Sequence, residues 1–99
     1  MTAPSPPGPA RGVVRLLNTS GGRVLCLAGD VDPAVVAAFV SRYGREPARV
    51  ERIDAASVTA LSQDGLELLR EHLAAAELSG RPVPVRCSPV VDAFLRVPA

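Results

Sequence analysis

The chain has 99 residues, which suits one compact domain and leaves no room for a second. Hydrophobic residues make up 47% of it and charged residues 21%, a balance that indicates a folded protein. Aromatic residues are only 3%, so the core must be aliphatic. With 11 Lys and Arg against 10 Asp and Glu, the net charge is +1, and the basic surplus expected of a non-specific nucleic-acid binder is absent.

The cysteines and the hydropathy of the chain favour a cytoplasmic protein. Cys26 and Cys87 have no metal-ligand spacing and are too few for a disulfide scaffold, so we expect two reduced thiols. Cys26 lies in the apolar run 24–28, where a free cysteine behaves as a small buried hydrophobe. No segment reaches the ~18 apolar residues that a membrane span needs. The first residues lack the charged and apolar regions of a signal peptide.

The first half of the chain predicts a tail, a hairpin and a helix. Residues 1–11 hold four of the ten prolines and predict a disordered tail ahead of a domain over residues 12–99. Apolar patterning indicates strands over Val13–Leu17 and Arg23–Ala28, joined by a turn rich in Ser and Gly. A helix over Pro33–Tyr43 follows, preceded by an Asp that is typical of an N-cap.

The second half predicts two more strands, each followed by a helix. A third strand over Arg49–Asp54 carries Glu and Arg in its middle, an unfavourable pair for a buried position. Leucines at helical spacing give one face of a long helix over Gln63–Leu78. A fourth strand over Pro82–Arg86 contains Pro84, whose missing N–H places it at a sheet edge. The last helix covers Pro89–Leu95, capped by a serine.

Together these elements predict a single α/β domain with a mixed four-stranded sheet and the order β-β-α-β-α-β-α. The first two strands form an antiparallel hairpin. Strands that alternate with helices are joined by right-handed crossovers, so the rest of the sheet should be parallel.

Residues of the types used in catalysis are few and scattered. His72, the single histidine, lies in mid-helix beside the apolar stripe, which indicates a structural residue at the helix surface or boundary. The acidic pair Asp30 and Asp32 flanks a helix start, and the pair Glu67 and Glu71 lies on a solvated helix face. There is no glycine-rich phosphate loop and no metal-ligand cluster in the sequence. We therefore expect a protein that is not an enzyme and has no cofactor and no metal.

The junction over residues 54–69, with the sequence DAASVTALSQDGLELL, stands out. A strand ends in Asp54, and the polar cluster SQDG at residues 62–65 opens the long helix. A helix N-terminus presents unpaired N–H groups and a partial positive charge, which favours anions or an added phosphate. We expect Gly65, in the first turn, to let a partner approach the backbone closely. The helix start is thus a predicted docking or switching surface.

Three segments carry a resemblance to a known family. Leu27–Asp32 has the pattern Gly, acid, apolar residue, Asp at a strand end. Ile53–Leu66 is similar to the pattern Asp-Leu-Ser-x-Val-x-x-x-Asp-Ser-Ser-Gly-Leu, and Gly80–Leu95 looks like a closing strand and helix. In these features the chain resembles the STAS family, best known for bacterial anti-sigma factor antagonists, over residues 13–97. The resemblance implies a mixed sheet with helices packed against it, in agreement with the elements above.

For function, the resemblance implies a regulatory module that acts by protein–protein recognition in the control of transcription, as in stress responses. A STAS antagonist binds an anti-sigma factor, commonly an ATP-dependent serine kinase, and thereby releases the sigma factor. Carried over to this sequence, the partner-binding residues lie at the end of a strand and at the start of the long helix: Asp30, Asp32, Ser62, Gln63, Asp64, Gly65 and Leu66.

The sequence departs from the family where the kinase normally acts, on a serine at the start of the long helix. On ungapped alignment this position is Gln63, which cannot carry phosphate, and the next residue is the anionic Asp64. Two interpretations stay open. Either phospho-control is lost and binding is constitutive, or Ser62 or Thr59 accepts the phosphoryl group instead, which adds about −1.5 to −2 charge.

Two other assignments within the same resemblance also stay open. One is the small STAS subunit of a lipid-transporting ABC system, which clips onto the nucleotide-binding subunit and tolerates the loss of the acceptor serine. The other is a scaffold-type STAS regulator. The thin aliphatic core is compatible with a homodimer, and neither nucleic acid nor membrane insertion is expected.

Overall fold

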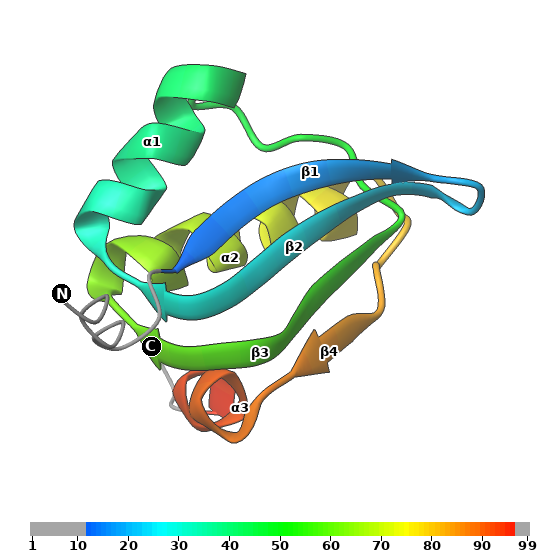
Figure 1. The fold of residues 1–99 in the computed structure, drawn as a ribbon. Helices are drawn as coiled ribbons and strands as arrows, with labels where there is room; N and C mark the ends of the chain where they lie inside the picture. The colour runs from blue at the N-terminus through cyan, green and yellow to red at the C-terminus, as the bar shows by residue number, and fades with distance from the viewer. Residues whose placement is uncertain (1–11, 97–99) are drawn as a thin grey trace, which may run out of the picture.

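The computed structural model describes residues 12–96; residues 1–11, the predicted disordered tail, and residues 97–99 lie outside the described residues. Four strands and three helices follow one another in the predicted order (Figure 1). They are β1 (Val13–Thr19), β2 (Gly22–Val31), α1 (Pro33–Tyr43), β3 (Arg52–Leu61), α2 (Gln63–Leu78), β4 (Val85–Cys87) and α3 (Pro89–Arg96). The α/β class predicted from the sequence is therefore confirmed.

The four strands form one mixed sheet in the order β1-β2-β3-β4. β1 and β2 are antiparallel, whereas β2 pairs with β3 and β3 with β4 in parallel. This arrangement confirms the predicted hairpin and the predicted parallel remainder. It also confirms that the strand following Pro84 lies at the edge, where the proline carbonyl accepts a hydrogen bond from the Ile53 N–H at 3.0 Å.

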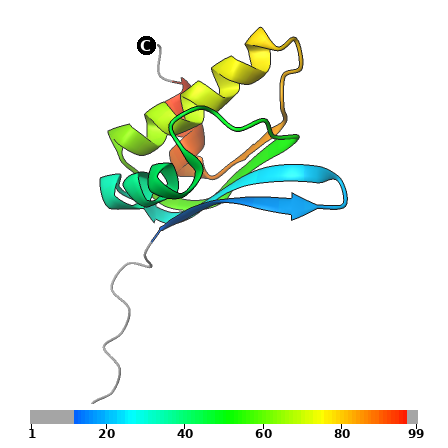
Figure 2. The ribbon, with the colours of Figure 1, turned by 90° about the horizontal axis from the view of Figure 1, so that it is seen from above.

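All three helices pack on one face of the sheet, which Figure 2 shows from above. The buried side chains of that face form a single core cluster, to which each of the three helices contributes at least one side chain. Its fully buried centre is aliphatic: Leu25, Leu27, Ile53, Leu69, Val31 and Val91. No helix formed by the described residues covers the opposite face. None of these helices has the length and hydropathy that crossing a bilayer would require.

The prediction for the third strand was wrong in its bounds, because β3 begins at Arg52 and continues to Leu61 instead of ending at Asp54. Its buried residues in this continuation are Ala55, Val58 and Leu61, which are three apart. A regular strand alternates every two residues, but the pairing with β2 is shifted twice here, and each shift inserts an extra residue. The shifts erase the alternation that would have indicated a strand.

The predicted conflict of Glu51 and Arg52 inside a buried strand does not arise. Glu51 lies before β3, its side chain is exposed, and its Oε1 is 3.6 Å from Nη2 of Arg81. Such an exposed ion pair contributes little to stability. The fourth strand is also shorter than predicted, Val85–Cys87 rather than Pro82–Arg86, because prolines precede it and cannot donate to the sheet.

The other bounds differ from the prediction by smaller amounts. The hairpin turn is tighter, since β1 extends to Thr19 and β2 already begins at Gly22. Gly22 has φ = +113°, a conformation that glycine adopts without the strain a side chain would cause. β2 continues to Val31, beyond the predicted end at Ala28, and α3 continues by one residue.

Candidate functional site

The structure brings the two predicted partner-binding segments together at one end of the sheet. β2 and β3 are parallel neighbours, so their carboxyl ends meet at the same edge, with Asp30 opposite Ala60. The Ser62 N–H donates to the Val31 carbonyl at 2.9 Å and joins the two strand ends directly. α1 and α2 both begin here, immediately after their strands.

The start of α1 uses its acidic residues for local structure. Asp32 is the N-cap, and its Oδ1 accepts a hydrogen bond from the Val35 N–H at 2.9 Å, as the sequence predicted. The Asp32 N–H donates to the Asp30 carbonyl at 3.1 Å. The Asp30 residue is half-buried at the end of β2. Asp32 therefore has a structural role as the cap of α1 that does not depend on a bound partner.

The start of α2 presents two of its residues to solvent. Ser62 is the half-buried N-cap, and its Oγ accepts a hydrogen bond from the Gly65 N–H at 3.1 Å. Gln63 and Asp64 are exposed. Asp64 lies in the first turn, where the helix dipole stabilises a carboxylate. Gln63 Nε2 lies 3.5 Å from Glu67 Oε2, one turn further along the helix.

Gly65 and Leu66 do not contribute to an accessible surface, and the expectation that a partner approaches the backbone at Gly65 was wrong. Gly65 is buried, and a Cβ placed on it would lie 2.8 Å from Cδ1 of Leu61 and 2.9 Å from Cγ1 of Val31. Leu66 belongs to the core cluster. Glycine is needed because α2 packs very closely on the ends of β2 and β3. The accessible part of the candidate site is therefore formed by Gln63 and Asp64, beside the half-buried Asp30.

The two alternative phosphate acceptors differ in their surroundings. Thr59 is exposed on β3, whereas the Oγ of half-buried Ser62 is already engaged as the helix cap. The chain between residues 24 and 41 and between residues 53 and 69 contains acidic residues but no arginine. A phosphate on either hydroxyl would add its charge of about −1.5 to −2 to an end of the molecule that is already acidic.

His72 is buried, with 3% of its surface exposed, so its predicted position at the helix surface or boundary was wrong. Its Nε2 accepts a hydrogen bond from the Ala48 N–H at 3.0 Å. Its Nδ1 must then carry the proton, which it donates to the Leu68 carbonyl at 2.9 Å. Both ring nitrogens are occupied. The ring connects α2 to the segment between α1 and β3, a role that no local pattern in the sequence indicates.

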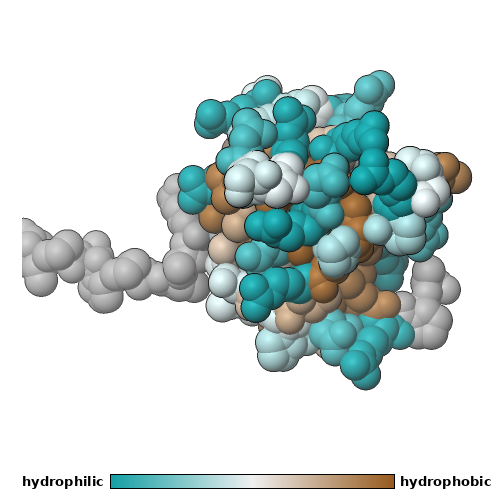
Figure 3. All heavy atoms as spheres, turned by 90° about the vertical axis from the view of Figure 1, so that its right-hand side faces the viewer, coloured by the Kyte–Doolittle hydropathy of each residue, from teal (hydrophilic) through white to brown (hydrophobic). Residues whose placement is uncertain are grey.

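A cavity of about 320 Å³ lies beside His72, between the C-terminal half of α2 and two connecting segments. Figure 3 views the molecule from the end where these connections lie, and hydrophobic atoms are visible there between hydrophilic side chains. The ionisable residues that line the cavity are Arg49, Glu51, His72 and Arg81. Glu51 and Arg81 pair with each other, and His72 has no free nitrogen. Arg49, which is exposed, is the remaining ionisable residue of the lining.

Replacing His72 with leucine should lower the free energy of unfolding by about 1–3 kcal/mol, because the half-buried Ala48 N–H would lose its acceptor. Urea denaturation followed by circular dichroism measures the loss. The matched control is Glu71→Leu, which introduces the same side chain at the neighbouring exposed position and should change stability by less than about 0.5 kcal/mol. Equal effects of the two substitutions would contradict the connecting role of His72.

Cys26 and Cys87 are free thiols, as predicted, and both are half-buried rather than buried in the core. Burial raises the pKa of both thiols, and the carboxylates of Asp54 and Asp92 raise the pKa further at Cys26 and Cys87, respectively. The thiolate is the reactive form of cysteine, so a raised pKa makes both residues poor nucleophiles near neutral pH.

No protein-family model, curated protein or solved structure matches this chain.

Proposed function

We propose that the protein is a non-catalytic regulatory binding module of the STAS type, similar to an anti-sigma factor antagonist, which binds an anti-sigma factor or a related serine kinase. The observation that carries the proposal is the exposure of Gln63 and Asp64 on the first turn of α2. This turn lies beside the end of β2, where the resemblance implies the partner contact. The order of strands and helices also agrees with the one the resemblance implies.

The charge of this surface suggests the chemistry of the partner. Asp30, Asp32 and Asp64 gather at one end of the sheet, and the flanking chain contributes no arginine. Charged groups across an interface are arranged with complementary signs, which speeds association and suppresses wrong partners. The partner surface should therefore present Arg or Lys, and binding should weaken as the salt concentration rises.

Binding in this proposal is constitutive. Gln63 occupies the exposed position at which a kinase would act in the family, and an amide cannot be phosphorylated. Ser62 supplies the cap of α2 through its Oγ, so modification there would compete with a helix hydrogen bond. Thr59 is the more accessible of the two remaining hydroxyl groups.

Co-purification from cells of the source, followed by mass spectrometry, tests the proposal. We expect the full-length chain to recover an anti-sigma factor or a kinase-like regulator. Asp64→Arg should weaken this binding about tenfold, which corresponds to about 1.4 kcal/mol, because it places a cation against a basic surface. The matched control is Glu77→Arg, the same change of charge at an exposed position near the other end of α2.

Two results would contradict the proposed module. The first is a regulator that binds the Asp64→Arg and Glu77→Arg variants equally well. The second is recovery of a transport ATPase in place of a sigma-regulating protein, which would favour the transporter-subunit assignment. Incubation with the recovered kinase and ATP should leave the intact mass unchanged. Gain of one phosphate, mapped to Ser62 or Thr59, would contradict constitutive binding.

A further inference from the structure

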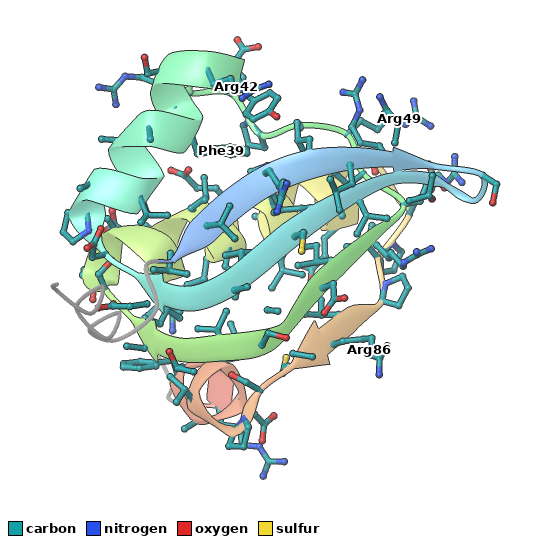
Figure 4. The ribbon with its side chains drawn as sticks, in the orientation of Figure 1. Phe39, Arg42, Arg49 and Arg86 are labelled. Atoms are coloured by element: carbon teal, nitrogen blue, oxygen red, sulfur yellow. The ribbon has the colours of Figure 1, made fainter. Side chains whose placement is uncertain are left out.

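The helix-free face of the sheet carries one residue from each strand in a single row. Arg15 on β1 pairs with Cys26 on β2, Cys26 with Asp54 on β3, and Asp54 with Arg86 on β4. The residues on either side of each of them lie in the core cluster or pack against it. Because side chains alternate along a strand, these four point away from the helices. Figure 4 shows Arg86 extending from β4.

No helix or strand of residues 12–96 lies over this face, as the views in Figures 1 and 2 agree. Arg15 and Arg86 are exposed, and Cys26 and Asp54 are half-buried. Next to the row, Leu17 keeps 38% of its surface exposed. The face thus presents an exposed leucine beside charged side chains of both signs.

The charges of the row have no ion-pair partners among the described residues. Residues 12–96 form two ion pairs, Arg81 with Glu51 and Arg96 with Asp92, and both lie away from this row. Arg15 and Asp54 lie on strands separated by β2, about 10 Å apart at the backbone. Oδ1 of Asp54 accepts a hydrogen bond from the Ala56 N–H at 3.1 Å, and no side chain or backbone group of residues 12–96 donates to its other oxygen.

We propose that this face is an interface between two copies of the chain, related by a twofold axis that runs along β2 at Cys26. A half-turn about an axis parallel to the strands turns the face over and exchanges the places of β1 and β3. Arg15 of each copy then meets Asp54 of the other, and the two Cys26 side chains meet at the axis. The order of charges along the row is thus self-complementary, as an isologous interface requires.

The same operation places Arg86 outside the contact. β4 lies two strands from the axis on one side, and the second copy has no strand at the corresponding position on the other side. Three facing strands of about seven residues give a contact of roughly 14 by 24 Å. This is small for a stable interface, so the dimer should dissociate on dilution.

Sedimentation velocity over a range of concentrations, on the full chain, tests the interface. We expect a monomer–dimer equilibrium. Arg15→Asp and Asp54→Arg should each raise the dissociation constant at least tenfold, because each places like charges face to face. The double variant Arg15→Asp/Asp54→Arg should recover most of the dimer. Arg86→Asp is the matched control and should change the dissociation constant less than about threefold.

Cross-linking gives a second test of the interface, and this test remains valid even if the charge-reversal variants do not fold. In a Cys87→Ser background, oxidation with copper phenanthroline at mildly alkaline pH, which offsets the raised pKa of the Cys26 thiol, should join two chains through a Cys26–Cys26 disulfide. In a Cys26→Ser background, in which Cys87 remains, the same oxidation should give no linked dimer. The proposal is overturned by a monomer at every concentration without a Cys26 cross-link. It is also overturned if the single charge reversals leave the dissociation constant of the dimer unchanged, or if the double variant stays monomeric.

Discussion

The Gly65→Trp variant is expected to lose at least about 3 kcal/mol of its free energy of unfolding, toward the upper end of what overpacking costs. Even a Cβ at this position would lie within 3.0 Å of both Val31 and Leu61. One of the neighbouring atoms, the Val31 carbonyl oxygen at 3.3 Å, belongs to the backbone and can move little. An indole ring would force the start of α2 away from the sheet.

Urea denaturation followed by far-ultraviolet circular dichroism measures this loss of stability. Domains of this size are stable by roughly 5–10 kcal/mol, so the variant should keep as little as about 2 kcal/mol and should unfold at a clearly lower urea concentration. Ala74→Trp is the control, because it adds the same ring at an exposed position of the same helix. A Gly65→Trp variant as stable as Ala74→Trp would contradict the packing of α2 described above. The buried position also makes Gly65 unsuitable for testing partner binding.

The second large effect is expected at the centre of the core. Leu69 is fully buried on the sheet-facing side of α2, and Leu69→Ala should cost about 3 kcal/mol through lost burial and the cavity left behind. At about 4–8 °C for each kcal/mol, its Tm should fall by at least ~10 °C.

Leu78 supplies a matched control on the same helix, since 90% of its surface is exposed. Leu78→Ala makes the same chemical change without opening a cavity, and it should shift Tm by no more than a few degrees. Thermal unfolding followed by circular dichroism compares the two variants. Similar shifts would mean that α2 does not rest on the sheet through Leu69.

The order of elements could be predicted because its signals are local. The caps Asp32, Ser62 and Ser88 each accept a hydrogen bond from a backbone N–H three residues further on, at the helix starts that the sequence indicates. The extent of β3 could not be predicted. Its pairing with β2 shifts register twice, and a register shift is set by the neighbouring strand rather than by the strand's own sequence.

In the candidate site, too, the features that follow from local sequence could be predicted and those that depend on long-range contacts could not. Parallel strands end at one edge, so the proximity of Asp30 and Ser62 follows from the order of elements. The burial of Gly65 and the hydrogen bond from Ala48 to His72 depend on contacts between segments far apart in the chain. No residue pattern within a single helix reports such contacts. Anti-sigma factor binding stays a prediction that rests on the resemblance and on the exposed helix start.

The shortness of β4 has a consequence for how these molecules behave at high concentration. A strand of three residues, reached through Pro82 and Pro84, offers few free donors along that margin of the sheet. Further strands cannot add there in a long ladder, so edge-to-edge growth is blocked on one side. Two molecules can still pair through their free β1 edges, but edge-to-edge addition cannot continue from such a pair into a fibre.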